Sequence, residues 1–166
     1  GATVTVPNGN VKAIYSDGAG SGGKMVDAFT NLHVNGLTSE VTGNDAALTV
    51  SSTDADANQG PLIVFKRESS SPADSDLLGR VNFNGFNDAS EGVTYGRIQS
   101  TIEDASDGTE DGEFNISTIV AGTQRSRLKF TGTETVFNEA SVDLDFRVET
   151  DTDANALFVQ GSTNRV

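Results

Sequence analysis

The stretch SVDLDFRVET (residues 141–150) carries apolar and polar side chains in strict alternation. Because successive side chains of a β-strand point to opposite faces of a sheet, this alternation predicts a strand with one buried face. The residues expected on the buried face are Val142, Leu144, Phe146 and Val148. The residues expected on the solvent face are Asp143, Asp145, Arg147 and Glu149. A second layer or a neighbouring chain has to cover the apolar face.

Similar apolar runs recur at short intervals from Pro61 onward, with Gly, Asn, Asp or Ser between them. They are PLIVFKRES (61–69), GRVNFNGFND (79–88), EGVTYGRIQSTIED (91–104), GEFNISTIVAG (112–122), SRLKFTG (126–132) and ETVFNE (134–139). A series of short strands separated by turns is typical of a β-sandwich, a barrel or a solenoid. Valine outnumbers leucine, and threonine is frequent, as expected for residues that pack on pleated strands. The sequence therefore predicts an all-β chain built of short-stranded modules of the sandwich or prism type.

Four parts follow one another along the chain. Residues 1–32 predict a β-hairpin module with its turn at 7–10, followed by a glycine-rich loop leading into a short strand or one helical turn. Residues 33–60 are poor in apolar side chains and predict a thin stem. Residues 61–139 predict the central β-module, and residues 140–166 a stem repeat. We expect both ends to continue into a longer protein.

The net charge is −13 and the isoelectric point is about 4.2. Such a charge repels a phosphate backbone, and the basic residues are scattered, so a nucleic-acid partner is not expected. Cysteine is absent, which excludes disulfides and thiolate zinc sites. No run approaches the roughly 20 apolar residues of a membrane helix, so membrane insertion is not expected.

The predicted stem segments offer few apolar side chains to any one face. A single copy of residues 33–60 or 140–166 could not exclude enough water to offset the ordering of its backbone. Three copies around an axis could, and an oligomer is the usual substitute for a disulfide framework. We therefore predict a homotrimer. The residues expected in its core are Val81, Phe83, Phe114 and Ile116 of the central module and Val142, Leu144, Phe146 and Val148 of the stem.

Most of the chain resembles modules found in tail fibres and related appendages of tailed bacteriophages, especially those of marine hosts. In residues 61–130 the marks are R-x-S-S-…-D-x-L-G at 67–79, F-x-G-x-N-D-A at 83–89 and D-G-T-E-x-G-E-F at 107–114. Residues 140–166 resemble a fibre stem repeat, and residues 3–20 a small β-module that commonly precedes such parts. The resemblance implies a trimeric, β-rich structural protein of the virion, and it implies no catalytic residue.

An acidic hexapeptide occurs twice, as TDADAN (53–58) and TDTDAN (150–155). Its D-x-D-x-N pattern is how a calcium loop of the EF-hand type begins, and such a loop requires Gly at its sixth position and Glu at its twelfth. The residues at those positions are Gln59 and Phe65 in the first copy and Ala156 and Ser162 in the second. The EF-hand reading therefore fails in both copies.

Two readings of the hexapeptide remain. A trimer could gather copies of Asp54, Asp56 or Asp153 around its axis and hold a hard cation. Alternatively, Asp and Asn side chains bond their own backbone and form a turn, and the motif appears twice because the stem repeats. We favour the turn, and we expect no cofactor.

No other motif predicts catalysis. DGTEDGE (107–113) is read as a solvated hairpin loop, and GAGSGG (18–23) lacks the Lys-Ser/Thr pair and the βα unit of a phosphate-binding loop. His33 is the only histidine and has no recognisable triad or metal partner. A capsule-degrading spike with paired carboxylates would need aromatic sugar platforms, but the chain has no tryptophan and only two tyrosines. We do not expect an enzyme.

The sequence thus predicts a structural segment of a bacteriophage fibre, located in the virion. Its expected partners are two further copies of itself and other tail or capsid proteins, together with a host surface glycan or protein that the fibre helps to reach. The alternatives are a receptor- or glycan-binding tip or decoration domain, with Phe86 and Tyr95 as the suggestive exposed aromatics, a polysaccharide-degrading tailspike, and a bacterial trimeric adhesin.

Overall fold

The computed structural model describes residues 4–6, 8, 13–28 and 34–163 of the 166-residue chain. It divides the chain into two compact units, Gly1–Leu62 and Ile63–Val166, which are described separately below. The described residues contain nine β-strands, one 3-10 turn and no α-helix, which confirms the all-β prediction. The predicted four-part division stays a prediction.

The first unit contains a small antiparallel hairpin. Strand β1 (Ile14–Ser16) pairs with β2 (Met25–Asp27), and the 3-10 turn η1 (Gly20–Gly22) lies in the loop between them. The glycine-rich stretch thus forms the expected loop with one helical turn and a following strand. Most of the predicted turn at residues 7–10 lies outside the described residues.

Asp17 organises the loop of this hairpin. Its Oδ1 accepts hydrogen bonds from the backbone N–H groups of Lys24 (3.0 Å) and Ala19 (3.1 Å). These bonds, the one from Lys24 first, hold the pKa of Asp17 below its usual value because they favour the carboxylate. A single carboxylate therefore binds backbone groups at both ends of a loop whose glycines would otherwise allow many conformations.

No strand forms between residues 34 and 76, all of which the structure describes. The predicted strand in PLIVFKRES is therefore wrong. Leu62 and Ile63 are 63% and 57% exposed, and Val64 and Phe65 are 66% and 59% exposed. A strand needs a second backbone to exchange N–H···O bonds with, and no segment among the residues that the structure describes supplies one here.

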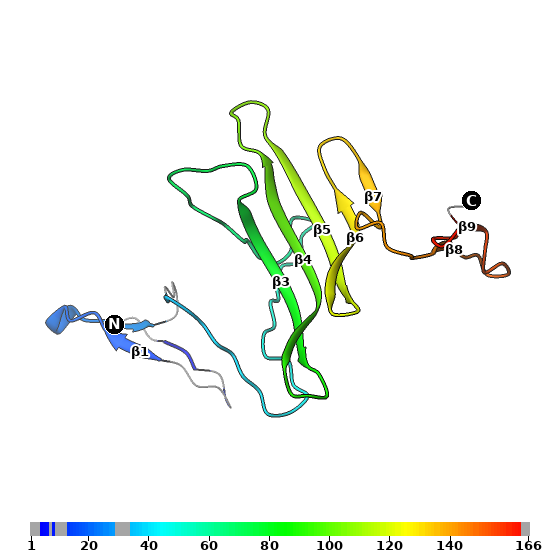
Figure 1. The fold of residues 1–166 in the computed structure, drawn as a ribbon. Coiled ribbons are helices and arrows are strands. Elements are labelled where there is room, and N and C mark those ends of the chain that lie inside the picture. The colour runs from blue at the N-terminus through cyan, green and yellow to red at the C-terminus, as the bar shows by residue number, and fades with distance from the viewer. Residues whose placement is uncertain (1–3, 7, 9–12, 29–33, 164–166) are drawn as a thin grey trace. The chain divides into compact units, whose positions relative to one another are not determined.

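The second unit is built around a five-stranded antiparallel meander in the order β3-β4-β5-β6-β7 (Figure 1). Its strands are β3 (Leu77–Phe86), β4 (Gly92–Asp104), β5 (Asp111–Val120), β6 (Thr123–Phe130) and β7 (Thr135–Phe137). Five of the six apolar runs in residues 61–139 thus form strands, each paired with its sequence neighbour. Short turns make these pairings local, which explains why sequence patterning was sufficient to find them.

The β5–β6 turn shows how local sequence sets the register. Val120 pairs with Thr123, which leaves Ala121 and Gly122 as a two-residue loop. Both loop residues have positive φ, 46° at Ala121 and 78° at Gly122. Positive φ at both central positions is the type I′ geometry, whose twist matches that of antiparallel strands. Glycine adopts it freely, whereas alanine adopts it with strain.

A second hairpin ends the unit, formed by β8 (Phe146–Val148) and β9 (Leu157–Val159). The predicted strand in SVDLDFRVET is therefore shorter than expected, since residues 141–145 pair with no strand. Its alternation nevertheless persists in the burial pattern, because Val142, Leu144 and Phe146 are half-buried whereas Asp143 and Asp145 are exposed. Strand pairing needs a partner backbone, but the side-chain alternation only needs an extended chain.

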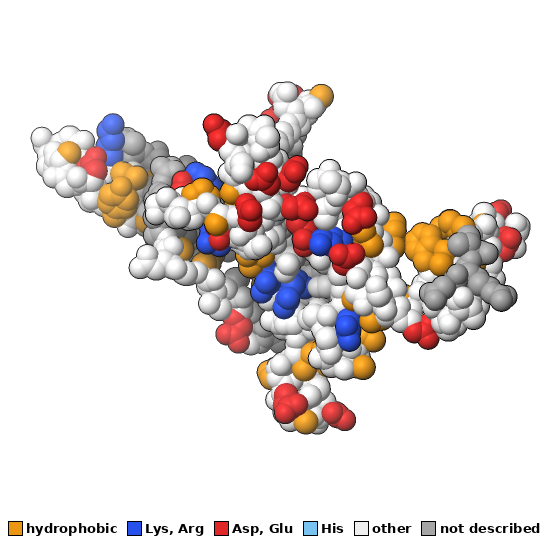
Figure 2. Space-filling view, turned by 45° about the horizontal axis from the view of Figure 1, so that its top comes forward, with side chains coloured by type: hydrophobic (Ala, Val, Ile, Leu, Met, Phe, Trp, Pro, Cys, Tyr) orange, Lys and Arg blue, Asp and Glu red, His pale blue; other side chains and the backbone are white. Residues whose placement is uncertain are grey.

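The described residues contain no fully buried hydrophobic side chain, and the one buried residue is Ser117, at 9% exposure. The five-stranded sheet is a single layer, and orange apolar side chains are visible at many places on the surface in Figure 2. A sheet of this kind normally packs its apolar face on another layer. The described residues of the second unit supply no such layer.

Candidate assembly surface

The five-stranded sheet has one apolar face. The register places Val81 beside Ile98, and Ile98 beside Ile116. It then places Ile116 beside Leu128, and Leu128 beside Phe137. Directly paired residues of antiparallel strands point to the same side, as do alternate residues of one strand. The apolar face so defined consists of Val81, Phe83, Ile98, Ile102, Phe114, Ile116, Leu128, Phe130 and Phe137.

The opposite face is polar and bonds itself. Arg97 Nε donates to Asn82 Oδ1 (3.3 Å), and Ser126 Oγ donates to Asn115 Oδ1 (3.2 Å). Ser117 and Gln124 are also hydrogen-bonded to each other on this face. Its further members are Arg80, Gln99, Thr101, Glu113 and Lys129. These bonds run across strands, although Gln99 Oε1 on the same face is buried without a hydrogen-bond partner among the described residues.

Lys129 is the charged centre of the polar face. Its Nζ lies 3.2 Å from Glu113 Oε2 and 3.5 Å from Glu139 Oε1. The hydrogen bond to Glu113 is the main reason that the pKa of Lys129 is raised above its usual value. The ammonium therefore ties β6 to β5 and to the segment after β7.

The apolar face has no comparable cover. Phe83 is 57% exposed and Phe137 is 54% exposed, while Phe114 and Phe130 lie 6.2 Å apart between ring centres and are 41% and 39% exposed. Full burial of one such side chain stabilises a fold by about 1.5–3 kcal/mol. Roughly half of that stabilisation is unrealised at these exposures. A sheet with one polar face and one face that exposes large apolar side chains is a candidate contact surface.

The chain that leads into β3 touches one edge of the apolar face. Arg67 forms an ion pair with Asp76 (2.8 Å) and also donates to the backbone oxygen of Leu77. Phe65 lies directly over Gly79, where an added Cβ would come within 2.6 Å of the Phe65 Cβ. A shallow hollow remains beside it, lined among others by Phe65, Gly79, Val81, Ile98 and Phe114. This segment shields a corner of the face and leaves its centre open.

The C-terminal hairpin meets the other end of the apolar face. The rings of Phe146 and Phe137 lie 4.9 Å apart at an interplanar angle of 50°. Gly161 donates its N–H to Asp145 Oδ1 (3.0 Å), and its lack of a side chain allows close approach to the backbone of Leu144. Phe146 of the predicted stem therefore contacts the last strand of the sheet, and the stem itself stays a prediction.

The structure brings together half of the predicted core residues. Val81, Phe83, Phe114 and Ile116 lie on the apolar face. Of the predicted stem residues, Phe146 contacts Phe137 at the end of that face, Val142 and Leu144 are half-buried beside the C-terminal hairpin, and Val148 is 45% exposed. Their role in a trimer core stays a prediction.

Five members of the apolar face were not singled out by sequence reasoning: Ile98, Ile102, Leu128, Phe130 and Phe137. All lie in runs that the sequence did identify as strands, and their alternation with polar neighbours was the available signal. For β6 this signal was broken by an irregular register between Ile116 and Ser117, which adds Arg127 to the strand.

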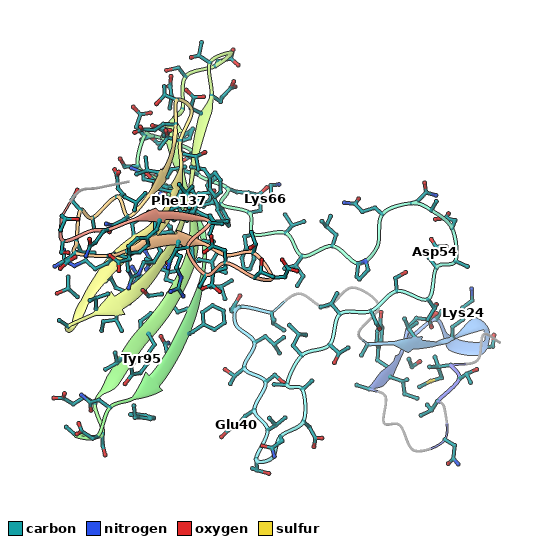
Figure 3. The ribbon with its side chains drawn as sticks, turned by 90° about the vertical axis from the view of Figure 1, so that its right-hand side faces the viewer. Lys24, Glu40, Asp54, Lys66, Tyr95 and Phe137 are labelled. Atoms are coloured by element: carbon teal, nitrogen blue, oxygen red, sulfur yellow. The ribbon has the colours of Figure 1, made fainter. Side chains whose placement is uncertain are left out.

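The two acidic hexapeptides use the same turn chemistry. In the first copy the Asn58 N–H donates to Asp56 Oδ1 (2.9 Å), and in the second the Asn155 N–H donates to Asp153 Oδ1 (2.8 Å). Asp54 Oδ1 accepts a further bond, from the Asp56 N–H, and Figure 3 shows Asp54 on the open, extended part of the first unit. The turn reading accounts for the conserved spacing of both copies. Among the described residues no group of three acidic or histidine side chains is arranged to hold a metal ion.

The residues of the motifs at 83–89 and 107–114 also have local structural roles. Asn87, in the second motif, accepts hydrogen bonds at Oδ1 from the N–H groups of Ala89 (3.1 Å) and Glu91 (2.8 Å), which closes the β3–β4 turn. Asp104 precedes the third motif and receives the Ser106 N–H at 2.8 Å. Hydrogen bonds from Ser106 are the main reason that the pKa of Asp104 is lowered. DGTEDGE thus lies in a β4–β5 hairpin turn and the start of β5, as expected.

His33 lies outside the described residues. Tyr95 and Phe86 are neighbours near the β3–β4 turn, where the Tyr95 hydroxyl donates to the Phe86 backbone oxygen (Figure 3 labels Tyr95). No helix in the described part of the chain is long and apolar enough to cross a membrane.

Comparisons of the chain with protein families, with curated proteins and with solved structures found no match.

Proposed function

We propose that this chain is a structural segment of a bacteriophage fibre, in which three copies pack their apolar faces around a common axis as a β-prism. The observation that carries the proposal is the uncovered apolar face of a single-layer sheet whose opposite face is polar and self-bonded. Packing three such faces together places about nine apolar side chains per copy in one core and leaves three polar faces toward water.

The function follows from the assembly and is mechanical. A rod of interlocked sheets holds a binding element away from the particle, and it needs neither turnover nor a cofactor. The segment is located in the virion. Its partners are the other copies and neighbouring tail or capsid proteins, and it supports the attachment of the particle to the host. The sequence motifs that resemble fibre modules support this assignment, as does the repetition of the stem turn.

The first test is the native mass of the purified 166-residue chain, measured by light scattering on a sizing column with and without a chelator. We expect the mass of three chains in both conditions. A trimer that dissociates in chelator would restore the axial cation at Asp54, Asp56 or Asp153. A monomer or a dimer would refute the threefold assembly.

A matched pair of variants tests the apolar face itself. Phe83→Asp places a charge on that face, and Asn82→Asp places the same charge on the polar face one residue away. Because an unpaired buried charge is very costly, we expect Phe83→Asp to abolish the trimer and Asn82→Asp to leave its mass unchanged. Equal behaviour of the two variants would show that the apolar face is not the contact surface.

A further inference from the structure

The two sides of the five-stranded sheet carry opposite charge at one end. Residues 81–96, which span most of β3, the β3–β4 turn and the start of β4, contain Asp88 and Glu91 and no Lys or Arg. Residues 114–133, which span most of β5 and all of β6, contain Arg125, Arg127 and Lys129 and no Asp or Glu. We name Asp88 and Glu91 the acidic corner, and Arg125 and Arg127 the basic corner.

The two corners lie at the same end of the sheet. The β3–β4 turn and the β5–β6 turn both close the lower end of the meander in Figure 1, and β4 and β5 separate them. An antiparallel meander always places alternate turns at the same end. The charge difference is therefore across the width of the sheet, from the β3 edge to the β6 edge.

The basic corner has no counter-ion among the described residues. Both arginines are half-buried, yet neither forms an ion pair with the described residues. Arg127 Nε donates to Thr118 Oγ1 (2.6 Å), and Arg125 pairs in register with Thr118, which follows Ile116 on the apolar face. Guanidinium groups held at the rim of a contact face without a carboxylate are costly, and in a chain of net charge −13 the missing partner is readily supplied by another copy.

The edges beside the corners are open. β3 pairs only with β4, and β7 pairs only with Leu128–Phe130 of β6. The Arg127 backbone oxygen accepts the Asn138 N–H (3.0 Å), so residues 123–126 are the part of β6 that has no described strand on its outer side. When the β3 edge of one copy meets the β6 edge of the next, the contact joins two different surfaces. Contacts of this heterologous type close into a ring when the rotation is right, which is the geometry of a threefold assembly.

We propose that in the homotrimer the basic corner of each copy forms ion pairs with the acidic corner of the next, so that Arg125 and Arg127 meet Asp88 and Glu91 of a second copy. This inference rests on the proposed function and adds the order in which the sheets join. Asp88 is the freer carboxylate, because Glu91 Oε2 already accepts a hydrogen bond from Asn87 (2.8 Å).

The test is a charge exchange in the full 166-residue chain. Arg127→Asp and Asp88→Arg each place like charges across the joint, and the double variant Asp88→Arg/Arg127→Asp restores opposite charges with reversed sign. The control is Asp107→Arg, which makes the same charge change in the turn at the other end of the sheet. The measurement is the chain concentration at which half of the protein is trimeric, by light scattering.

We expect each single variant to raise that concentration at least about tenfold, since like charges in a contact weaken it strongly. The double variant should return to within about threefold of the original chain, and the control should not differ from it. The single-variant effect should shrink at high salt, because salt screens charges that remain near solvent.

The outcomes separate the two proposals. If the original chain is a trimer and the single variants assemble equally well, or the double variant fails to recover, the corner contact is refuted and the fibre assembly stands. If the original chain is a monomer, the fibre assembly is refuted and the corner contact with it. Should Arg127→Asp lose its sheet signal in circular dichroism, Asp88→Arg decides alone, because Asp88 lies in an exposed turn.

Discussion

Phe114 offers a quantitative test of whether a second copy covers the apolar face. In the single chain its ring touches Phe130 and is 41% exposed. Truncation of a fully buried Phe to Ala lowers the free energy of unfolding by about 3–5 kcal/mol. For a ring that is about half exposed, the expected loss is roughly half of that, about 1.5–2.5 kcal/mol. In the proposed trimer the ring is fully buried in every copy. Phe114→Ala should therefore lower the free energy of unfolding by about 3–5 kcal/mol per chain.

The assay is urea unfolding of the assembled protein at a fixed chain concentration, followed by circular dichroism, with its concentration dependence as a second readout. Phe86→Ala is the control, since it makes the same truncation at a ring that is 77% exposed and lies at the end of β3 outside the apolar face. We expect the control to cost under about 1 kcal/mol. Equal losses in the two variants, or a Phe114→Ala loss near 1.5 kcal/mol without concentration dependence, would refute burial by a neighbour.

Three further predictions concern local structure. Ala121→Asn should stabilise the chain by about 0.5–1 kcal/mol in urea unfolding, because asparagine accepts the positive φ of 46° more readily than alanine in a type I′ turn. Gly79→Ala should destabilise it by about 1–3 kcal/mol, because the new methyl group would lie 2.6 Å from the Phe65 Cβ. Acidification should loosen the β4–β5 turn: the pKa of Asp104 is lowered in the folded chain, so its contribution is present above the ordinary value of 3.8 and is lost as the pH falls through the lower folded pKa. Amide exchange at Ser106, whose N–H bonds Asp104, should report the loss, and Asp104→Asn should remove this pH dependence.

Each of these predictions has a clear contrary result. Ala121→Asn that lowers the urea midpoint would mean that the β5–β6 loop is not type I′ in solution. For the close contact at residue 79, Gly92→Ala is the comparison, since a Cβ there meets nothing within 4 Å, and equal losses would place Phe65 elsewhere. Ser106 exchange that is insensitive to acid would show that the Asp104 carboxylate does not hold the turn.

The local features of the fold were readable from the sequence. Alternation in GRVNFNGFND and GEFNISTIVAG predicted β3 and β5, and it placed Val81 and Phe83 on one face and Phe114 and Ile116 on one face. The turn residues between strands were equally informative, because Asn, Asp and Gly satisfy or permit turn backbones through contacts a few residues away. Such information is local and therefore available before folding.

The pairing of segments was not readable. PLIVFKRES has the composition of a strand and forms none, whereas FRV (146–148) and LFV (157–159) pair around the second acidic hexapeptide. The first hexapeptide has apolar flanks too, but Gly60 and Pro61 precede its second flank, and a proline lacks the N–H that a ladder requires. The same turn chemistry therefore closes a hairpin in one copy and not in the other.

The sequence by itself determined the all-β class, the positions of the turns and the side chains that share a face within each strand, because these depend on a period of two and on contacts between near neighbours. Only the tertiary structure decided that Val81, Ile98, Ile116, Leu128 and Phe137 form one continuous row, because that row depends on the register of separate strands. It also decided that none of these five side chains is fully buried among the described residues, since burial is a property of the whole arrangement and not of any one strand.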